Sequence, residues 1–206
     1  MSTSALDLAP VIPVVIVDDV ESAVPLARAL VAGGLPAVEV TLRTPAALGA
    51  IERIAAEVEG AFVGAGTVLT PDQAQAAAKA GARFLVTPGC TETLYGALVE
   101  TGLSFLPGTS TVSEVLRLRE LGVREMKFFP AEASGGAPYL KSLASPVPDV
   151  RFCPTGGITP VSAPTYLTLP NVACVGGSWM LPADAVASRD WARVEKLART
   201  ASGLRG

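Results

Sequence analysis

The feature that most constrains the fold is an alternation, repeated along the chain, of a short apolar segment with a longer amphipathic one. Continuous β-branched runs such as residues 11–17 are typical of strands that are buried on both faces of a parallel sheet. The segments between them, such as residues 20–32, place their apolar residues on one helical stripe and end at glycine. A repeated strand-then-helix order predicts parallel strands that are connected by helices.

Eight strands are predicted in this way, over residues 11–17, 37–41, 61–65, 83–86, 104–106, 125–130, 150–153 and 171–175. Helices are predicted over residues 20–32, 45–58, 71–80, 91–100, 112–121 and 191–200. Because no position marks a reversal of strand order, closure into a (β/α)8 TIM barrel is favoured over an open doubly wound sheet. No linker, low-complexity stretch or block of charge divides the chain, so residues 1–206 are expected to form a single compact domain.

Composition excludes several classes of function. The net charge of -3 and the absence of a Lys/Arg cluster argue against a nucleic-acid partner. No apolar run has the length of a membrane span, and residues 1–10 lack the pattern of a secretory signal, so a soluble cytoplasmic protein without a membrane partner is expected. The 3 cysteines, Cys90, Cys153 and Cys174, are interpreted as buried reduced thiols. The chain has no histidine, which excludes His-based triads and His-ligated metals.

The sixth predicted strand carries a lysine within an apolar stretch. Strand alternation places Lys127 on the same face as Glu125 and Phe129, while Met126 and Phe128 point the other way. A lysine removed from water must be paired or must lose its proton, and a neutral amine is the nucleophile that a Schiff base requires. Lys127 is therefore a candidate catalytic residue. The alternative is an edge-strand lysine whose ammonium group lies in solvent.

The second predicted strand places a carboxylate among apolar residues. Glu39 shares a face with Ala37 and Thr41, so Glu39 and Lys127 are both expected on inward faces. Burying two ionisable groups is costly, which indicates a function, although a structural ion pair remains the alternative. Arg43, just past the strand end, could hold a carboxylate with its planar guanidinium group or could be a surface residue.

Glycines gather at the ends of the predicted strands. Glycine permits close approach of backbone N–H groups to a ligand, but one glycine at a strand end could serve only the turn. After the seventh and eighth strands, Gly156, Gly157, Gly177 and Ser178 occupy the corner where (β/α)8 enzymes frequently bind phosphate through backbone amides. The sequence therefore predicts a phosphate or similar anion site at this corner.

With these residues placed, the sequence resembles the 2-dehydro-3-deoxy-phosphogluconate (KDPG) aldolases, also called 4-hydroxy-2-oxoglutarate (KHG) aldolases, which are class I enzymes of the Entner–Doudoroff pathway. The resemblance runs from about Val11 to the last predicted helix. It is carried by five segments: Glu39-Val-Thr-Leu-Arg43, Gly64-Ala-Gly-Thr67, Lys127-Phe-Phe-Pro-Ala131, Pro154-Thr-Gly-Gly157 and Gly176-Gly-Ser-Trp179. The resemblance implies a (β/α)8 barrel, usually a homotrimer, that needs no metal and no organic cofactor.

The resemblance also implies roles for single residues. Lys127 matches the Schiff-base lysine, and Glu39 matches the general acid/base. Arg43 and Thr67 match the residues that hold the pyruvyl carboxylate. The other matched positions line the pocket or lie near the distal hydroxyls and phosphate: Pro88, Phe129, Thr155, Gly156, Gly157 and Ser178.

Two positions bear on the substrate. The hydroxyl of Thr155 favours the gluconate epimer, because the related phosphogalactonate enzymes tend to carry an aliphatic residue there. Asp18 and Asp19 stand where relatives commonly carry a basic residue near the far end of the substrate, which leaves room for a less anionic aldehyde.

The expected reaction is reversible cleavage of KDPG to pyruvate and glyceraldehyde 3-phosphate, with 4-hydroxy-2-oxoglutarate as a second possible substrate that yields pyruvate and glyoxylate. Two alternatives from other classes are consistent with the residues. One is a phosphosugar isomerase or epimerase that uses Glu39 as a base, with Lys127 only as an electrophile. The other is a non-catalytic barrel that binds a phosphometabolite and in which the buried pair is structural.

Overall fold

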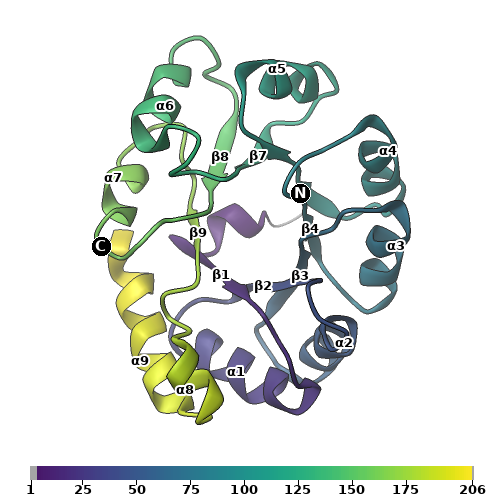
Figure 1. Cartoon of the computed structure of the whole chain (residues 1–206), viewed down its shortest axis with the longest axis vertical. Helices are drawn as coiled ribbons and strands as arrows, with labels where there is room; N and C mark the ends of the chain where they lie inside the picture. The colour runs from purple at the N-terminus through teal and green to yellow at the C-terminus, as the bar shows by residue number, and fades with distance from the viewer. Residues whose placement is uncertain (1–3, 206) are drawn as a thin grey trace.

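In a computed structural model of the protein, which describes residues 4–205, parallel strands close into a barrel that helices surround (Figure 1). The predicted (β/α)8 barrel is confirmed. The strands are β1 (Val11–Val15), β2 (Ala37–Thr41), β3 (Phe62–Gly66), β4 (Phe84–Val86), β5 (Ser104–Leu106), β6 (Gly108–Thr109), β7 (Glu125–Phe128), β8 (Arg151–Pro154) and β9 (Val175–Gly177). The helices are α1 (Val20–Ala32), α2 (Ala47–Glu57), α3 (Pro71–Lys79), α4 (Glu92–Glu100), α5 (Val112–Glu120), α6 (Gly136–Leu143), α7 (Ala163–Leu167), α8 (Ala183–Ala187) and α9 (Trp191–Ser202), with short 3-10 turns η1 (Ala5–Asp7) and η2 (Gly203–Arg205).

The barrel closes from two sheets, ordered β5-β4-β3-β2-β1-β9 and β6-β7-β8. β5 and β6 are two parts of one barrel strand, which is interrupted at Pro107 because proline has no N–H group to donate. The Lys127 N–H donates to the Pro107 carbonyl at 3.0 Å, which continues the pairing across the interruption. On the other side, a parallel bridge between Thr155 and Gly176 joins β8 to β9.

The last strand differs most from its prediction. Strand pairing was expected over residues 171–175, whereas β9 covers Val175–Gly177. Residues 171–173 do run beside β8, because the Phe152 N–H donates to the Asn171 carbonyl and the Ala173 N–H donates to the Phe152 carbonyl. Pairing with β1 begins only at Val175, opposite Val11. The apolar run correctly indicated burial, but which backbone it pairs with depends on barrel closure.

Three helices, α6, α7 and α8, were not predicted. α7 and α8 have only 5 residues each, which is too short to display helical periodicity. α6 follows Gly135, which has a left-handed φ of 104°. The Gly-Gly-Ala-Pro stretch at its start is typical of a loop, so no helix was predicted there. The consequence matters for the site, because α8 lies just after β9 at the carboxyl end of the barrel.

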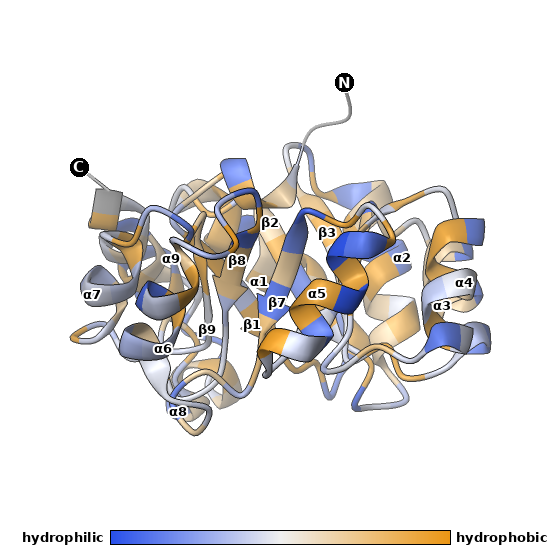
Figure 2. Cartoon of the chain, turned by 90° about the horizontal axis from the view of Figure 1, so that it is seen from above, coloured by the Kyte–Doolittle hydropathy of each residue, from blue (hydrophilic) through white to orange (hydrophobic). Residues whose placement is uncertain are grey.

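Apolar side chains form two layers. The outer layer lies between strands and helices and includes Met126 and Phe128, so the predicted outward face of β7 is confirmed. The inner layer fills the barrel near the amino ends of the strands and includes Ile12, Phe62, Phe84, Leu106, Cys153 and Cys174. Figure 2 shows most strands and the inner sides of the helices as hydrophobic, with β7 partly hydrophilic and many hydrophilic residues on the outside.

The chain before β1 closes the amino end of the barrel. Leu6 in η1 is completely buried and packs in the inner layer, and this segment crosses the centre of the ring in Figure 1. Ser4 Oγ donates to Glu125 Oε2 at 2.7 Å, and Arg151 forms ion pairs with both Asp7 and Glu125. Only the carboxyl end of the barrel is therefore left open for a ligand.

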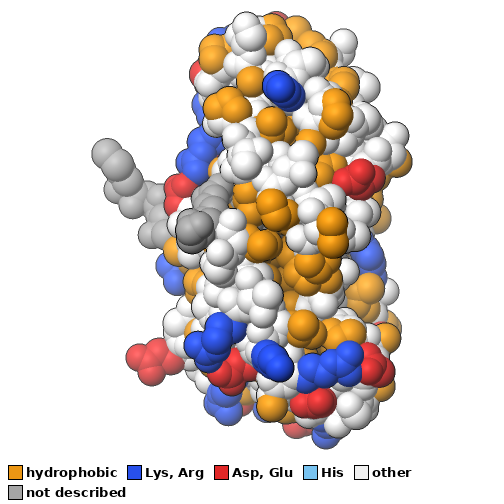
Figure 3. All heavy atoms as spheres, turned by 90° about the vertical axis from the view of Figure 1, so that its left-hand side faces the viewer, with side chains coloured by type: hydrophobic (Ala, Val, Ile, Leu, Met, Phe, Trp, Pro, Cys, Tyr) orange, Lys and Arg blue, Asp and Glu red, His pale blue; other side chains and the backbone are white. Residues whose placement is uncertain are grey.

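The outer surface over α8 and α9 carries charges of both signs, as Figure 3 shows in its lower part. Arg193 pairs with Asp184, and Arg199 pairs with Glu195. Exposed pairs of this kind add little to stability, because water screens the charges and the side chains lose freedom. Among residues 4–205, no helix has the length and apolar character needed to cross a bilayer.

Candidate active site

An ion pair is buried inside the barrel. Lys127 on β7 and Glu39 on β2 bring Nζ and Oε1 to 3.2 Å, and their side chains are only 5% and 2% exposed. The alternative of an edge-strand lysine in solvent is therefore wrong. The Phe129 ring lies beside the amine, with its centroid 5.4 Å from Nζ. Because water is excluded, each of these charges depends on the other for its stabilisation.

The pair spans the interior of the barrel, since β2 and β7 belong to different sheets and are not neighbours. β3, which does pair with β2, makes room for the carboxylate. A Cβ atom at Gly66 would overlap the Glu39 side chain, and one at Gly64 would overlap the Phe84 ring. Neither glycine has a positive φ, so these two residues provide space rather than backbone freedom.

At the mouth of the barrel, the structure brings Arg43 and Thr67 together. Arg43 Nε donates to Thr67 Oγ1 at 3.1 Å. Thr67 has a φ of 56°, a region that β-branched residues rarely occupy, and such strain is frequent at ligand sites. Within residues 4–205, the Arg43 guanidinium makes no other hydrogen bond, so its remaining N–H groups can take a carboxylate.

A cavity of about 280 Å³ opens at the carboxyl ends of the strands. Its lining consists of Val14, Arg43, Phe129, Thr155, Gly156, Gly157, Ile158, Gly176, Gly177 and Ser178. Most of the predicted substrate-binding residues thus meet in one place. Val14, Ile158 and Gly176 were not predicted as site residues; strand alternation from Ile12 could have indicated Val14. Pro88 and Thr67 are not in this lining, and Lys127 and Glu39 reach it only through Phe129, whose ring lies beside the amine. The main chain of Pro88 lies close to Gly108, and the role of Pro88 stays a prediction.

The turn after β8 requires its two glycines. Gly156 and Gly157 have φ values of 104° and 81°, which side-chain-bearing residues rarely adopt. The turn is held against the segment after β7, because the Ala131 N–H donates to the Thr155 carbonyl at 2.8 Å and the Glu132 N–H donates to the Gly156 carbonyl at 3.1 Å. The glycine turn and the lysine strand therefore form one connected unit.

Two residues that support this turn were missed by the sequence analysis. Tyr166 on α7 is 1% exposed, and its hydroxyl donates to Glu132 Oε1 at 2.8 Å. The aliphatic part of Glu132 lies against Gly157, where a Cβ atom would come within 2.8 Å of it. Burial above all, and then the hydrogen bond to Glu132, raises the pKa of Tyr166 well above its ordinary value of 10.0. No local sequence pattern marks this contact.

Within residues 4–205, the cysteines and acidic residues offer no metal site. Over the same residues, Cys90, Cys153 and Cys174 form no disulfide, and Cys90 is half-buried rather than buried as expected. Burial raises the pKa of the Cys90 thiol, which disfavours the reactive thiolate. In the part of the chain that the structure describes, no three His, Cys, Asp or Glu residues cluster in a way that could hold a metal ion.

We expect Tyr166→Phe to lower the free energy of unfolding at neutral pH by about 1.5–3 kcal/mol, because it removes a hydrogen bond to a charged acceptor. The raised pKa keeps the folded hydroxyl protonated where the unfolded one ionises, so this contribution is complete below the unfolded pKa of about 10 and declines progressively as the pH rises from there towards the raised pKa of the folded state. Denaturant unfolding of both proteins from pH 7 to 11 should show the difference narrowing at high pH.

The control for this prediction is Tyr139→Phe, whose ring stacks on Phe128 and whose hydroxyl makes no hydrogen bond within residues 4–205. It should change the free energy of unfolding by about 0.5 kcal/mol or less at pH 7. A difference between the native protein and Tyr166→Phe that stays constant to pH 11 would contradict the assignment.

Comparisons with known proteins agree with this geometry. The family described as KDPG and KHG aldolase matches residues 3–197. The KHG/KDPG aldolase of Escherichia coli (strain K12) is 52% identical over 198 residues, which cover 96% of this chain and 93% of that protein. The 2-dehydro-3-deoxy-phosphogluconate aldolase of Zymomonas mobilis is 50% identical over 202 residues, which cover 98% of this chain and 95% of that protein.

Solved structures agree as well. The KDPG aldolase of Legionella pneumophila, with pyruvate captured at low pH as a covalent carbinolamine intermediate, is 44% identical and superposes with a TM-score of 0.94 over 97% of each chain. The Zymomonas mobilis enzyme with 3-phosphoglycerate is 50% identical, with a TM-score of 0.92 over 97% of this chain and 94% of the other. On the combined evidence of fold, site and similarity, this chain belongs to the KDPG and KHG aldolase family.

Proposed function

We propose that this chain is a class I pyruvate aldolase that reversibly cleaves KDPG to pyruvate and glyceraldehyde 3-phosphate, and that it also cleaves 4-hydroxy-2-oxoglutarate to pyruvate and glyoxylate. The observation that carries the proposal is the buried Lys127–Glu39 pair in a member of this family. A carbinolamine, as captured with pyruvate in the Legionella relative, is the first covalent adduct of an amine with a ketone. Family membership favours this chemistry over an isomerase or a non-catalytic barrel.

The first half of the mechanism forms the Schiff base. Glu39 lies 3.2 Å from the amine of Lys127 and can take its proton, which leaves a neutral nucleophile beside a neutral acid. The amine attacks the ketone carbon of the substrate to give a carbinolamine. Glu39 then supplies a proton so that water leaves, and the product is an iminium ion on Lys127.

The second half breaks the carbon–carbon bond. The iminium withdraws electrons, so the C3–C4 bond cleaves while Glu39, directly or through one water, accepts the proton of the C4 hydroxyl. Glyceraldehyde 3-phosphate leaves, and a pyruvate enamine remains on Lys127. Glu39 returns a proton to C3 of the enamine, and hydrolysis then releases pyruvate and the free amine.

The cavity lining gives the substrate its orientation in this proposal. Arg43, supported by Thr67, holds the pyruvyl carboxylate near the mouth of the barrel, and the Phe129 ring packs beside the amine. The distal hydroxyls and the phosphate bind at the glycine corner, formed by Thr155, Gly156, Gly157, Gly177 and Ser178. A bidentate guanidinium and a set of backbone N–H groups suit these two anionic ends.

Borohydride reduction in the presence of pyruvate tests the covalent step. We expect a reduced pyruvyl adduct on the peptide that contains Lys127, identified by mass mapping, because borohydride converts an imine into a stable amine. Lys127→Ala should lose both the adduct and KDPG cleavage. Lys79→Ala, which changes an exposed lysine at the end of α3, is the matched control and should keep both. An adduct on another lysine would refute the assignment.

Glu39→Gln tests the proton transfers. The amide keeps the size of the side chain but cannot exchange protons, so we expect turnover to fall by about two to four orders of magnitude. Pyruvate release is measured with coupled lactate dehydrogenase, an assay in which an isomerase would give no signal. Turnover within tenfold of the native enzyme would show that Glu39 is not the general acid/base.

The proposal includes the form in which the enzyme works: one catalytic domain over residues 1–206, in the cytoplasm, as a homotrimer. Cysteines that form no disulfide within residues 4–205 suit a reducing compartment. Leu48, in the first turn of α2, and Leu69, just before α3, are 38% and 55% exposed, and their helices are neighbours. We assign these two side chains to the interface between subunits, because a contiguous exposed apolar patch marks an interaction site. The number three rests on the family resemblance.

Light scattering after size exclusion should give a mass three times the 21.0 kDa of one chain. Leu69→Lys should shift this mass towards the monomer, because burying a charge at an interface is costly. The control is Leu121→Lys, the same substitution at another exposed leucine that lies elsewhere in the sequence. A monomeric native protein at micromolar concentration would exclude the trimer.

A further inference from the structure

A second cavity, of about 370 Å³, opens beside the catalytic one. Its lining consists of Val14, Ile16, Asp18, Leu26, Ser178, Leu181, Ala183, Val186 and Ala187. Val14 and Ser178 line both cavities, so the two adjoin where β1 and β9 end. In the proposed mechanism the substrate occupies the first cavity, up to Ser178, and the second cavity has no role.

The lining of the second cavity is largely apolar. Val14, Leu26, Leu181 and Val186 supply aliphatic walls, and α8 forms the outer side. Ile16 lines the cavity with 47% of its surface still exposed to water, so an apolar ligand would gain free energy by covering it. These walls suit a hydrocarbon chain better than a polar group.

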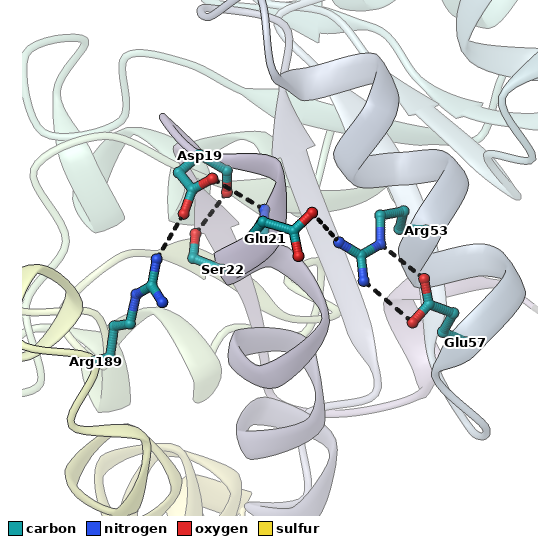
Figure 4. A network of polar contacts seen from close by, with 6 residues as sticks. All are labelled: Asp19, Glu21, Ser22, Arg53, Glu57 and Arg189. Atoms are coloured by element: carbon teal, nitrogen blue, oxygen red, sulfur yellow. Dashed lines mark hydrogen bonds and ion pairs between the residues drawn. The ribbon is translucent and has the colours of Figure 1, made fainter.

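The single charged residue in this lining is Asp18, and no basic residue accompanies it. Its neighbour Asp19 is engaged elsewhere: Asp19 caps α1 by accepting from the Glu21 N–H at 3.1 Å and pairs with Arg189 at 2.9 Å (Figure 4). Arg189 is thereby held by Asp19 rather than by Asp18. A carboxylate without a cation at this position repels an anion, so an uncharged ligand is favoured.

We propose that this second cavity, the acceptor-tail cavity, binds the hydrocarbon tail of an uncharged aliphatic aldehyde, so that the enzyme adds pyruvate to such aldehydes as well as to a phosphorylated acceptor. The inference rests on the proposed function. The aldehyde carbonyl occupies the catalytic cavity above Lys127, and the tail passes Val14 and Ser178 into the acceptor-tail cavity. The two volumes together lie within the range of about 300–1,000 Å³ that is common for small-molecule sites.

The reaction needs no additional reagent. C3 of the pyruvate enamine on Lys127 forms a bond to the aldehyde carbon, and the aldehyde oxygen takes a proton from Glu39 to become a C4 hydroxyl. The electron pair of the enamine provides the new bond, which regenerates an iminium. Addition of one water then releases a 4-hydroxy-2-oxo acid and the free lysine, and this water replaces the one lost when the imine formed.

The test measures kcat/KM for the condensation of pyruvate with butanal, pentanal and hexanal, with product quantified by mass spectrometry. Each added CH2 group that enters an apolar site should raise kcat/KM about threefold to fourfold, since its transfer from water is worth roughly 0.8 kcal/mol. Glyoxylate, which is too short to reach past Ser178, is the reference acceptor. A flat profile from butanal to hexanal would overturn the inference.

Two tryptophan variants test whether the dependence of kcat/KM on chain length arises in the acceptor-tail cavity. Ala187→Trp fills the acceptor-tail cavity, while Ala192→Trp changes an exposed alanine of α9 that does not line it. We expect the dependence on chain length to disappear in Ala187→Trp and to persist in Ala192→Trp, with the pyruvate adduct at Lys127 and condensation with glyoxylate unchanged in both. The same dependence in both variants would place the tail elsewhere.

A charge reversal tests the role of Asp18. Asp18→Lys should raise kcat/KM for glyceraldehyde 3-phosphate relative to hexanal by severalfold, and this gain should shrink in high salt because screening weakens the attraction. An unchanged ratio would show that Asp18 does not disfavour anionic acceptors. If the native enzyme neither cleaves KDPG nor forms the pyruvate adduct, the proposed function itself is refuted. If it forms the adduct but its kcat/KM does not depend on the chain length of the aldehyde, only the acceptor-tail cavity is refuted.

Discussion

The rest of the structure depends on the burial of one lysine against one glutamate. Lys127 and Glu39 are almost completely shielded from solvent, so each is stabilised chiefly by the other, and loss of either partner leaves an uncompensated charge. Their strands are not neighbours, and the pair therefore forms only when the barrel is closed and in register. The same arrangement places a proton acceptor beside an amine, which is what imine chemistry requires.

The two ends of the barrel have different roles: the amino end is packed and supports stability, and the carboxyl end holds the site. At the amino end, η1 and the inner apolar layer fill the interior. Glu125 accepts a hydrogen bond from Ser4 there and forms an ion pair with Arg151. At the carboxyl end, small residues leave space: Gly66 makes room for Glu39, and Gly176 makes room for Thr155. An apolar plug at one end and missing side chains at the other produce a cavity that opens on one side only.

The fold and the central pair could be predicted from sequence because they depend on local periodicity. A strand buried on both faces must be apolar throughout, and alternation decides which side a residue such as Lys127 faces. The short helices α7 and α8 escaped prediction since 5 residues contain too little periodicity. The support of the glycine turn by Tyr166 and Glu132 joins residues 34 positions apart, a contact that no local pattern encodes.

By itself, the sequence determined the class of fold, the inward direction of Lys127 and Glu39, and the glycine corner, because these follow from side-chain alternation and from the positions of residues along strands. Only the tertiary structure decided what depends on packing between distant segments. It set the 3.2 Å separation of the pair, and it gave Asp18 and Asp19 different surroundings, one beside a cavity and the other at a helix cap. Adjacent residues in a loop have no fixed direction until the elements around them pack.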